Sequence, residues 1–308
     1  MDTFFYTLQL EKRLGVLNKD IGLNMAYHIW RVGLDIQNGF MRALAVQHRR
    51  YGWQLRHWWQ FPLPDDTLRS GSLHHTEALC EVLLKWRRLL PRHISLRVAF
   101  PAQQVLQQRL SAPDNRLREP ERSWYIESMA ARKLPISSDS LSMDYREDPH
   151  APGSLLITAA RRSELARWLE CLHAVDLHPE VVDISACAIR CMAALAGLKN
   201  NRIFLHRLVD GWLWVSPLNH AFHFGMIHGD EWTEESAILP WVSARYGQQI
   251  DDVAYYSSTS SSFTTGSESD ALLSWSPLVA FNHMQPPLPD FPPAFVIAGG
   301  LALRPGDA

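Results

Sequence analysis

The residues with the clearest chemical potential lie where an apolar run meets a turn. The run from Val32 to Ile36 contains one acid, Asp35, and the turn residues Asn38 and Gly39 follow it. Asn-Gly between two apolar runs predicts a tight hairpin, because both residues tolerate positive φ. An acid at such a strand end could hold a magnesium-bound nucleotide, and the turn could cradle its phosphate.

A metal site is a second chemical alternative. His228, Asp230 and Glu231 are close in sequence and are residue types that bind metals. No further ligand at matching spacing is evident, so a solvated turn is the simpler interpretation. His74 and His75 precede a helical pattern, where we expect both to be exposed.

A two-metal nuclease is a third alternative. Asp35, Asp183 and Asp210 could mimic the carboxylate cluster that such enzymes use. Asp210 falls in a turn, however, and no fourth acid is evident. The sequence therefore gives this alternative little support.

The elements that would position Asp35 form a regular series. After the hairpin come a third strand over Trp53–Phe61, an amphipathic helix over Thr76–Leu90 and a buried strand over Ile94–Phe100. The helix is predicted from apolar residues spaced three and four apart, and Pro91 ends it. The first unit is therefore β-β-β-α-β.

The same series restarts after residue 201. The predicted strands are Arg202–Leu208, Trp212–Ser216, Ala221–Met226 and Val253–Tyr256, with a helix over Glu231–Tyr246 before the last. A duplicated β-β-β-α-β unit is the architecture of the actin-like ATPases. We therefore predict an α/β fold of the actin-like, ribonuclease H-like class, with an α/β subdomain inserted between the two units.

The predicted division of the chain follows these patterns. We expect residues 1–24 to be a loosely ordered extension, and the serine-rich loop 257–269 to be poorly packed because it has too little apolar surface. Residues 285–293 (QPPLPDFPP) should form a stiff, polyproline-like connector rather than an SH3-type ligand. The remaining ranges are 25–95 for the first actin-like subdomain, 96–182 for the insertion, 183–284 for the second actin-like domain, and 285–308 for the connector with a C-terminal element that returns to the first domain.

Composition excludes several classes of protein. The 308 residues carry a formal net charge of −2 and are 46% hydrophobic, which suits a globular chain of about two domains. Nucleic-acid binding usually needs a basic face, so we expect no direct contact with nucleic acid. No segment approaches the ~20 apolar residues that span a bilayer, and the N-terminus lacks the features of a signal peptide. These observations predict a cytoplasmic protein without membrane insertion.

The cysteines give no sign of a metal or redox site. Cys80, Cys171, Cys187 and Cys191 show no CxxC pair and no zinc-ligand spacing with histidine. We interpret them as buried free thiols that act as small hydrophobes. A reducing compartment fits this interpretation.

Taken together, these segments resemble the PilM family of type IV pilus assembly proteins. The resemblance runs from residue 25 to the C-terminus and includes GLDIQNGFMRALAV, LRVAFPAQQVLQQRL and FVIAGGLALRP. It implies an FtsA-like variant of the actin fold and a cytoplasmic protein that binds the N-terminal cytoplasmic tail of PilN, a single-pass inner-membrane protein. It places that contact in a groove between the first domain and the insertion, around residues 96–172. The enterobacterial member of the family implies a link to DNA uptake and the use of DNA as a nutrient.

The residues that would bind nucleotide depart from the family pattern. The first phosphate loop of the family reads GLDIGSSSVK, and here only its first four residues match. Gln37 replaces the next glycine, Asn38, Gly39 and Phe40 replace the three serines, and Arg42 replaces the lysine. Glycine lets the backbone approach phosphate closely, so Gln37 opposes phosphate binding, and Asp35 remains as a strand-end residue.

Two further loops are also altered. The second phosphate loop is replaced by Asp210-Gly211, which we interpret as an ordinary hairpin turn. The adenosine loop is replaced by residues 256–259 (YSST), with no glycine until Gly266, and Gly299-Gly300 suit close packing of the final helix instead. We therefore expect no cofactor and no catalysis, and predict an adaptor. The alternative is an ATP- and magnesium-dependent ATPase or nucleotide-gated switch of the same apparatus.

Overall fold

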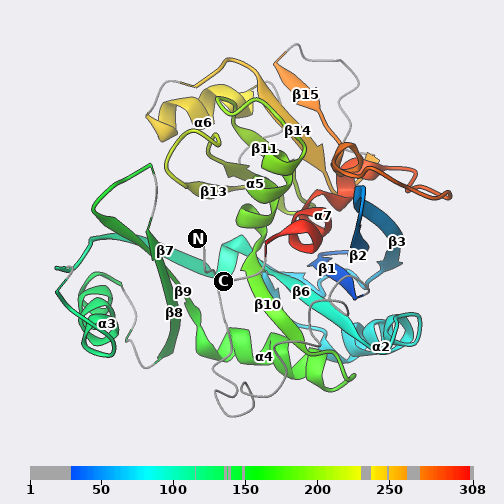
Figure 1. Ribbon diagram of the computed structural model, residues 1–308, viewed down its shortest axis with the longest axis horizontal. Coiled ribbons are helices and arrows are strands. Elements are labelled where there is room, and N and C mark those ends of the chain that lie inside the picture. The colour runs from blue at the N-terminus through cyan, green and yellow to red at the C-terminus, as the bar shows by residue number, and fades with distance from the viewer. Residues whose placement is uncertain are drawn as a thin grey trace.

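The computed structural model of the chain describes residues 29–305, apart from 115, 135–136, 138–139, 148–149, 230–236, 248–249 and 262–270. Two five-stranded sheets and one three-stranded sheet form its framework (Figure 1). The predicted N-terminal extension, residues 1–24, lies outside the described residues.

The first sheet has the strand order β10-β6-β1-β2-β3. The central strand β1 pairs antiparallel with β2 and parallel with β6, and β6 pairs parallel with β10. Alternating apolar residues and the Asn38-Gly39 turn explain the hairpin. The strands of the first sheet are β1 (Trp30–Gln37), β2 (Phe40–Arg49), β3 (Gly52–Pro62), β6 (Ile94–Phe100) and β10 (Pro179–Ile184).

The second sheet repeats this arrangement with the order β13-β12-β11-β14-β15. Its central strand pairs antiparallel with β12 and parallel with β14, as β1 does with β2 and β6. The predicted duplication is therefore confirmed. The strands are β11 (Phe204–Arg207), β12 (Gly211–Val215), β13 (Phe224–His228), β14 (Ala254–Ser258) and β15 (Leu272–Ser274).

The repeat differs from the sequence prediction at β13 and β15. The strand β13 begins three residues later than the predicted Ala221, and β15 is a short, partly exposed strand that the sequence did not indicate. The helix α6 spans Ile238–Tyr246, while residues 230–236 of the predicted helix lie outside the described residues. In the first unit, α2 (Thr76–Arg87) occupies the equivalent place.

The inserted sheet has the order β7-β9-β8. Its strands are β7 (Val105–Ser111), β8 (Leu141–Glu147) and β9 (Ser154–Arg161), and the helix α3 (Glu121–Lys133) packs on it. Along β9, alternate residues belong to different cores, since strand side chains alternate between faces. Those facing α3 are Leu155, Ile157 and Ala159, and those facing the main core are Leu156 and Ala160.

The insertion is shorter than the predicted range 96–182. Both β6 and β10, which contain the predicted limits, pair within the first sheet. Helix α4 (Arg162–His173) packs against α2 of the first unit. We therefore use the word insertion for residues 105–161 only.

Two central helices, α5 (Ser185–Leu195) and α7 (Val296–Leu303), lie between the two large sheets (Figure 1). Every residue of α7 is buried, as expected for a helix that is apolar on all sides. It contacts β1, β2, β6 and α5. A Cβ at Gly33 of β1 would lie 2.0 Å from Ala298 O, and a Cβ at Gly300 would lie 1.9 Å from Ala188 O. The sequence expectation of close packing at Gly300 is confirmed.

Residues 282–287, which lead into and begin the proline-rich segment, cover the edge of the first sheet. Asn282 N donates to Trp53 O at 2.9 Å, and Leu55 N donates to His283 O at 2.9 Å. The indole of Trp58 donates to Pro287 O at 2.9 Å. Edge strands need such protection because their free backbone groups invite pairing with other chains.

The expectation that residues 257–269 pack poorly is wrong for the first three of them. Ser257, Ser258 and Thr259 are each at most 1% exposed, because they continue β14 beside β11. Their small hydroxyl side chains fit this buried strand end. Residues 262–270 lie outside the described residues.

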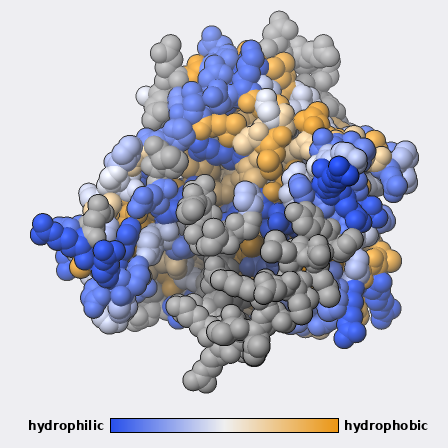
Figure 2. Space-filling model, in the orientation of Figure 1, coloured by the Kyte–Doolittle hydropathy of each residue, from blue (hydrophilic) through white to orange (hydrophobic). Residues whose placement is uncertain are grey.

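The surface in Figure 2 is hydrophilic along its flanks, while apolar side chains gather over its upper central part, around α5 and β14. Exposed apolar residues of the described chain include Leu195 at the end of α5 and Val279 in the short helix η6 (Pro277–Ala280). None of the helices in the described ranges is long and apolar enough to cross a membrane.

We predict that Gly300→Ala lowers the free energy of unfolding by about 2 kcal/mol or more, because the added methyl group would overlap the backbone of α5. Urea denaturation followed by circular dichroism measures this change. Gly229→Ala is the matched control, since its Cβ would lie 3.4 Å from the nearest atom, Asp210 O. It should change the free energy by less than about 0.5 kcal/mol, and equal effects of both variants would contradict the close-packing argument.

Candidate functional site

Asp35 is buried near the end of β1, with 1% of its surface exposed. Gln37 Nε2 donates to Asp35 Oδ1 at 2.7 Å, whereas Asp35 Oδ2 has no hydrogen-bond partner. Burial raises the pKa of Asp35 to about 6, and the Gln37 hydrogen bond and the charge of Arg42 offset this only in part. The side chain that replaces the family's glycine therefore binds the acid from within the protein.

Arg42 lies opposite Asp35 on β2 and connects the two large sheets. Its Nε donates to Gln60 Oε1 on β3 at 2.9 Å, and its Nη2 donates to Thr259 O, just beyond β14, at 2.5 Å. Burial lowers the pKa of Arg42 to about 10, an effect that Asp35 partly opposes, so the side chain is a cation at neutral pH. We call this place, where Arg42 meets Thr259, the sheet junction.

His206 belongs to the same buried polar region. It lies on β11 with 1% exposure, and its Nδ1 hydrogen-bonds the Ser257 hydroxyl at 2.8 Å. Burial, followed by the positive charge of Arg42, lowers the pKa of His206 to about 3. The ring is therefore neutral. No pattern in the sequence pointed to His206, because its relation to Arg42 exists only in the folded chain.

The other loop residues adopt ordinary turn and strand structure. Gly39 has φ +82°, as the hairpin requires, while Asn38 does not take positive φ, and its Oδ1 is buried without a partner. Leu208 N donates to Gly211 O at 2.8 Å, which closes the hairpin predicted at Asp210-Gly211. Residues 256–259 run along β14 and its end rather than forming an open loop.

The acids of the nuclease alternative are not brought together. Asp183 accepts from Arg304 Nε at 2.8 Å, and both side chains are buried. Asp35 is bonded by Gln37, and Asp210 lies in a turn. Over the ranges described, no three histidine, cysteine or acidic groups lie close enough together to hold a metal ion.

The predicted histidine and cysteine positions lie apart from this region. His74 and His75 are exposed before α2, and His228 is exposed at the end of β13, while Asp230 and Glu231 lie outside the described residues. The cysteines are free, and Cys80 Sγ lies 2.7 Å from Cys171 Sγ. Burial is the main reason why the pKa is raised for three of the thiols, Cys171, Cys187 and Cys191. These three thiols are therefore neutral.

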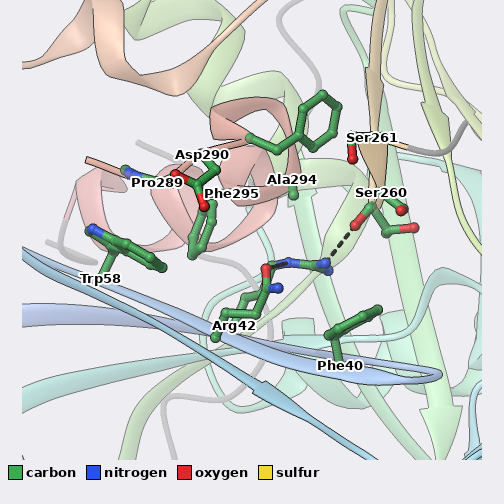
Figure 3. A pocket seen from close by; sticks show the side chains of 12 residues that line it. Phe40, Arg42, Trp58, Ser260, Ser261, Pro289, Asp290, Ala294 and Phe295 are labelled. Atoms are coloured by element: carbon green, nitrogen blue, oxygen red, sulfur yellow. Dashed lines mark hydrogen bonds between the residues drawn. The ribbon is translucent and has the colours of Figure 1, made fainter. Parts of the chain in front are cut away.

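A cavity of about 200 Å³ adjoins the sheet junction (Figure 3). Four separate segments line it, and Figure 3 shows Arg42 surrounded by Phe40, Trp58 and Phe295, with Ser260 and Ser261 opposite. Sequence reasoning missed this cavity, because its walls lie far apart in the chain. The lining residues are Phe40, Arg42, Trp58, Gln60, Thr259, Ser260, Ser261, Pro289, Asp290, Phe291, Ala294 and Phe295.

Comparison with known proteins identifies the family. The family model described as type IV pilus assembly protein PilM matches residues 33–202, more than half of the chain. The chain belongs to the PilM family. The DNA utilization protein HofM of Escherichia coli (strain K12) is 28% identical over 281 residues, which cover 91% of this chain and 98% of HofM.

Solved structures confirm the actin-like fold of this PilM-family chain. A structure of a PilM-PilN type IV pilus biogenesis complex is similar, with a TM-score of 0.71 at 18% identity, covering 89% of this chain and 97% of that one. The cytoplasmic domain of EpsL, an inner membrane component of the type II secretion system of Vibrio cholerae, gives a TM-score of 0.53 at 11% identity, covering 90% of this chain and 95% of that one. At these identities, the likeness shows the fold alone.

In this family member the insertion and the residues that flank it contact both repeated units. The short hairpin of β4 (Leu68–Arg69) and β5 (Ser72–Leu73) bonds to residues that directly flank the insertion on either side. Gln104 Nε2 donates to Ser70 O at 2.7 Å, and Ser72 Oγ donates to Glu164 Oε2 of α4 at 2.7 Å. Arg109 Nη2 of β7 donates to Phe222 O at 2.9 Å, before β13. The predicted partner groove would run along this seam, and it stays a prediction.

We predict that Asp35→Asn stabilises the protein at pH 7.5. Folding raises the pKa of Asp35 from 3.8 to about 6, so the folded state binds the proton of this carboxyl group more tightly than the unfolded state does. The free energy of unfolding therefore falls as pH rises between these two pKa values, and above the higher one the loss amounts to about 3 kcal/mol. Asparagine removes this titration.

Urea denaturation at pH 7.5 and near pH 4 tests this expectation. The variant should be more stable than the wild type at the higher pH, and the difference should nearly vanish at the lower one. Asp252→Asn, at an exposed position, is the control and should shift stability little at either pH. A loss of stability in Asp35→Asn at pH 7.5 would show that the charged carboxylate is favourably bound.

Proposed function

We propose that this chain is a non-catalytic adaptor of a type IV pilus-like apparatus for DNA uptake and utilisation. It acts in the cytoplasm, where it binds the N-terminal tail of a PilN-like single-pass inner-membrane protein. That partner holds it at the inner membrane. The chain itself neither hydrolyses ATP nor contacts DNA.

The bond from Arg42 to Thr259 O carries the non-catalytic part of this proposal. It joins the two sheets through the protein's own side chain, at the position where the phosphate loop of the family has a lysine. Asp35 is bonded to Gln37 and is desolvated, so that its charged form is disfavoured. A magnesium-nucleotide complex needs an accessible acid and close backbone approach, and Asp35 is buried. These features weigh against the alternative of a nucleotide-gated switch.

The partner is proposed from the similarity to known proteins. The solved structure of a PilM-PilN complex shares the fold over 89% of this chain. The relative HofM is a DNA utilization protein, and its match to this chain covers 98% of HofM. Together they support a PilN-like partner and a role in using DNA.

The seam beside the insertion is the proposed place of contact. The strands β7 and β8 are the edges of the inserted sheet, and an extended tail can add backbone hydrogen bonds to a sheet edge while its side chains enter pockets. A disordered tail loses conformational entropy when it binds, so we expect a dissociation constant in the micromolar range, about −8 kcal/mol.

Hydrogen–deuterium exchange of the full chain with a synthetic tail peptide of the neighbouring PilN-like protein tests this proposal. We expect slower exchange in β7, β8 and α4, with no change in β11 to β15. A scrambled peptide of the same composition is the control. Protection confined to the second sheet would move the site, and no binding of the tail at about 1 mM would contradict the adaptor role.

A further inference from the structure

The cavity beside the sheet junction has a charged end and an apolar end. At the charged end, Arg42 is 2% exposed and Thr259 is 1% exposed. Arg42 Nη1 and Thr259 Oγ1 are both buried without a hydrogen-bond partner. Buried polar atoms of native proteins are nearly always satisfied, so this end of the cavity lacks an acceptor that the two groups could share.

The cation of Arg42 is not neutralised by direct contact. The hydrogen bonds that its Nε and Nη2 donate go to neutral oxygens, Gln60 Oε1 and Thr259 O. Asp35 acts on it electrostatically, but its Oδ1 is bonded to Gln37. A buried cation whose own hydrogen-bond partners are neutral favours an anion in the adjoining space, because electrostatic attraction is strong in a medium of low dielectric constant.

Aromatic rings form the apolar end. The ring centroid of Phe40 lies 4.7 Å from the guanidinium carbon of Arg42. Trp58 meets Phe295 edge-to-face, with ring centroids 5.6 Å apart. The indole N–H of Trp58 is already used by Pro287 O, so this ring offers only its apolar surface. Asp290 is exposed at the rim, where solvent screens its charge. The walls therefore suit a flat or branched apolar body.

Size and charge limit the class of ligand. Pockets for drug-sized molecules measure roughly 300–1,000 Å³, and this cavity of about 200 Å³ is smaller. One arginine and one hydroxyl match a single negative charge better than a polyphosphate. We propose that the cavity binds a small organic carboxylate carrying one ring or a branched apolar group, with the carboxylate at Arg42 and Thr259.

Such a ligand would stabilise the arrangement of the two sheets. It would contact β2 and β3 of the first sheet, the end of β14 in the second, and the segment leading into α7. Two sources share this chemistry: a free aromatic acid, or the C-terminal carboxylate of a peptide that ends in an apolar residue. The site is separate from the seam proposed for the membrane partner, and it does not depend on that proposal.

Calorimetric titration of the full chain with phenylacetate and with its neutral analogue phenylacetamide tests the inference. We expect the acid to bind at least about tenfold more tightly than the amide. The peptide Gly-Gly-Gly-Phe, with a free or an amidated C-terminus, forms the second arm. Preference for either acid over its amide supports the proposal, and the arm that binds more tightly identifies the source.

Gln60→Glu is the decisive variant, because it is nearly isosteric and gives Arg42 an ion-pair partner from within the protein. It should weaken binding of the acid by at least about tenfold without loss of thermal stability. Gln54→Glu makes the same change on β3 outside the cavity and should bind the acid as the wild type does. Equal binding of acid and amide, no effect of Gln60→Glu, no binding up to about 10 mM, or displacement of the acid by micromolar Mg-ATP would each overturn the proposal.

Discussion

The sheet junction is built around the buried guanidinium of Arg42. Removing a cation from water costs several kcal/mol, and here the cost is met by the oxygens of Gln60 and Thr259 and by the field of Asp35. Because Thr259 belongs to the second sheet and Arg42 to the first, the same contact fixes how the two sheets meet. The bond from Arg42 to Thr259 therefore both stabilises the buried positive charge and sets the arrangement of the two sheets.

The helix α7 adds a steric constraint to this electrostatic one. Its glycine and alanine residues let it approach β1 and α5 so closely that a single methyl group would overlap backbone atoms. The segment before α7 also forms one wall of the cavity at the sheet junction. Movement of one sheet against the other would disturb both the helix packing and the bond to Thr259. This packing supports the proposal that the protein presents a fixed surface and does not cycle with nucleotide.

Local patterns in the sequence predicted much of the fold. The hairpin at Asn38-Gly39, the repeated unit and the close packing at Gly300 all follow from residue types and spacing. The strand β15 was missed because three residues, of which two are exposed, carry no periodic signal. The buried strand end at Ser257 was misjudged because serine composition suggested a loop, whereas pairing with β11 decided the outcome.

The candidate site was less accessible to sequence reasoning. The replacement of glycine by Gln37 predicted a lost phosphate loop, but not that Gln37 would bind Asp35. The contact between Arg42 and Thr259 joins residues 217 positions apart, and the roles of His206 and the aromatic cavity depend on the same long-range folding. Such contacts require the packing of whole units, which no short window of sequence contains.

In the proposed adaptor, side chains rather than a bound nucleotide hold the sheet junction together. Calorimetric titration of Mg-ATP into the protein, alone and in complex with the tail peptide, distinguishes these two possibilities. We expect no binding tighter than about 1 mM and the same peptide affinity with and without Mg-ATP, since coupled sites must alter each other's affinity. A micromolar dissociation constant for Mg-ATP that Asp35→Ala abolishes would show instead that the protein binds nucleotide through Asp35.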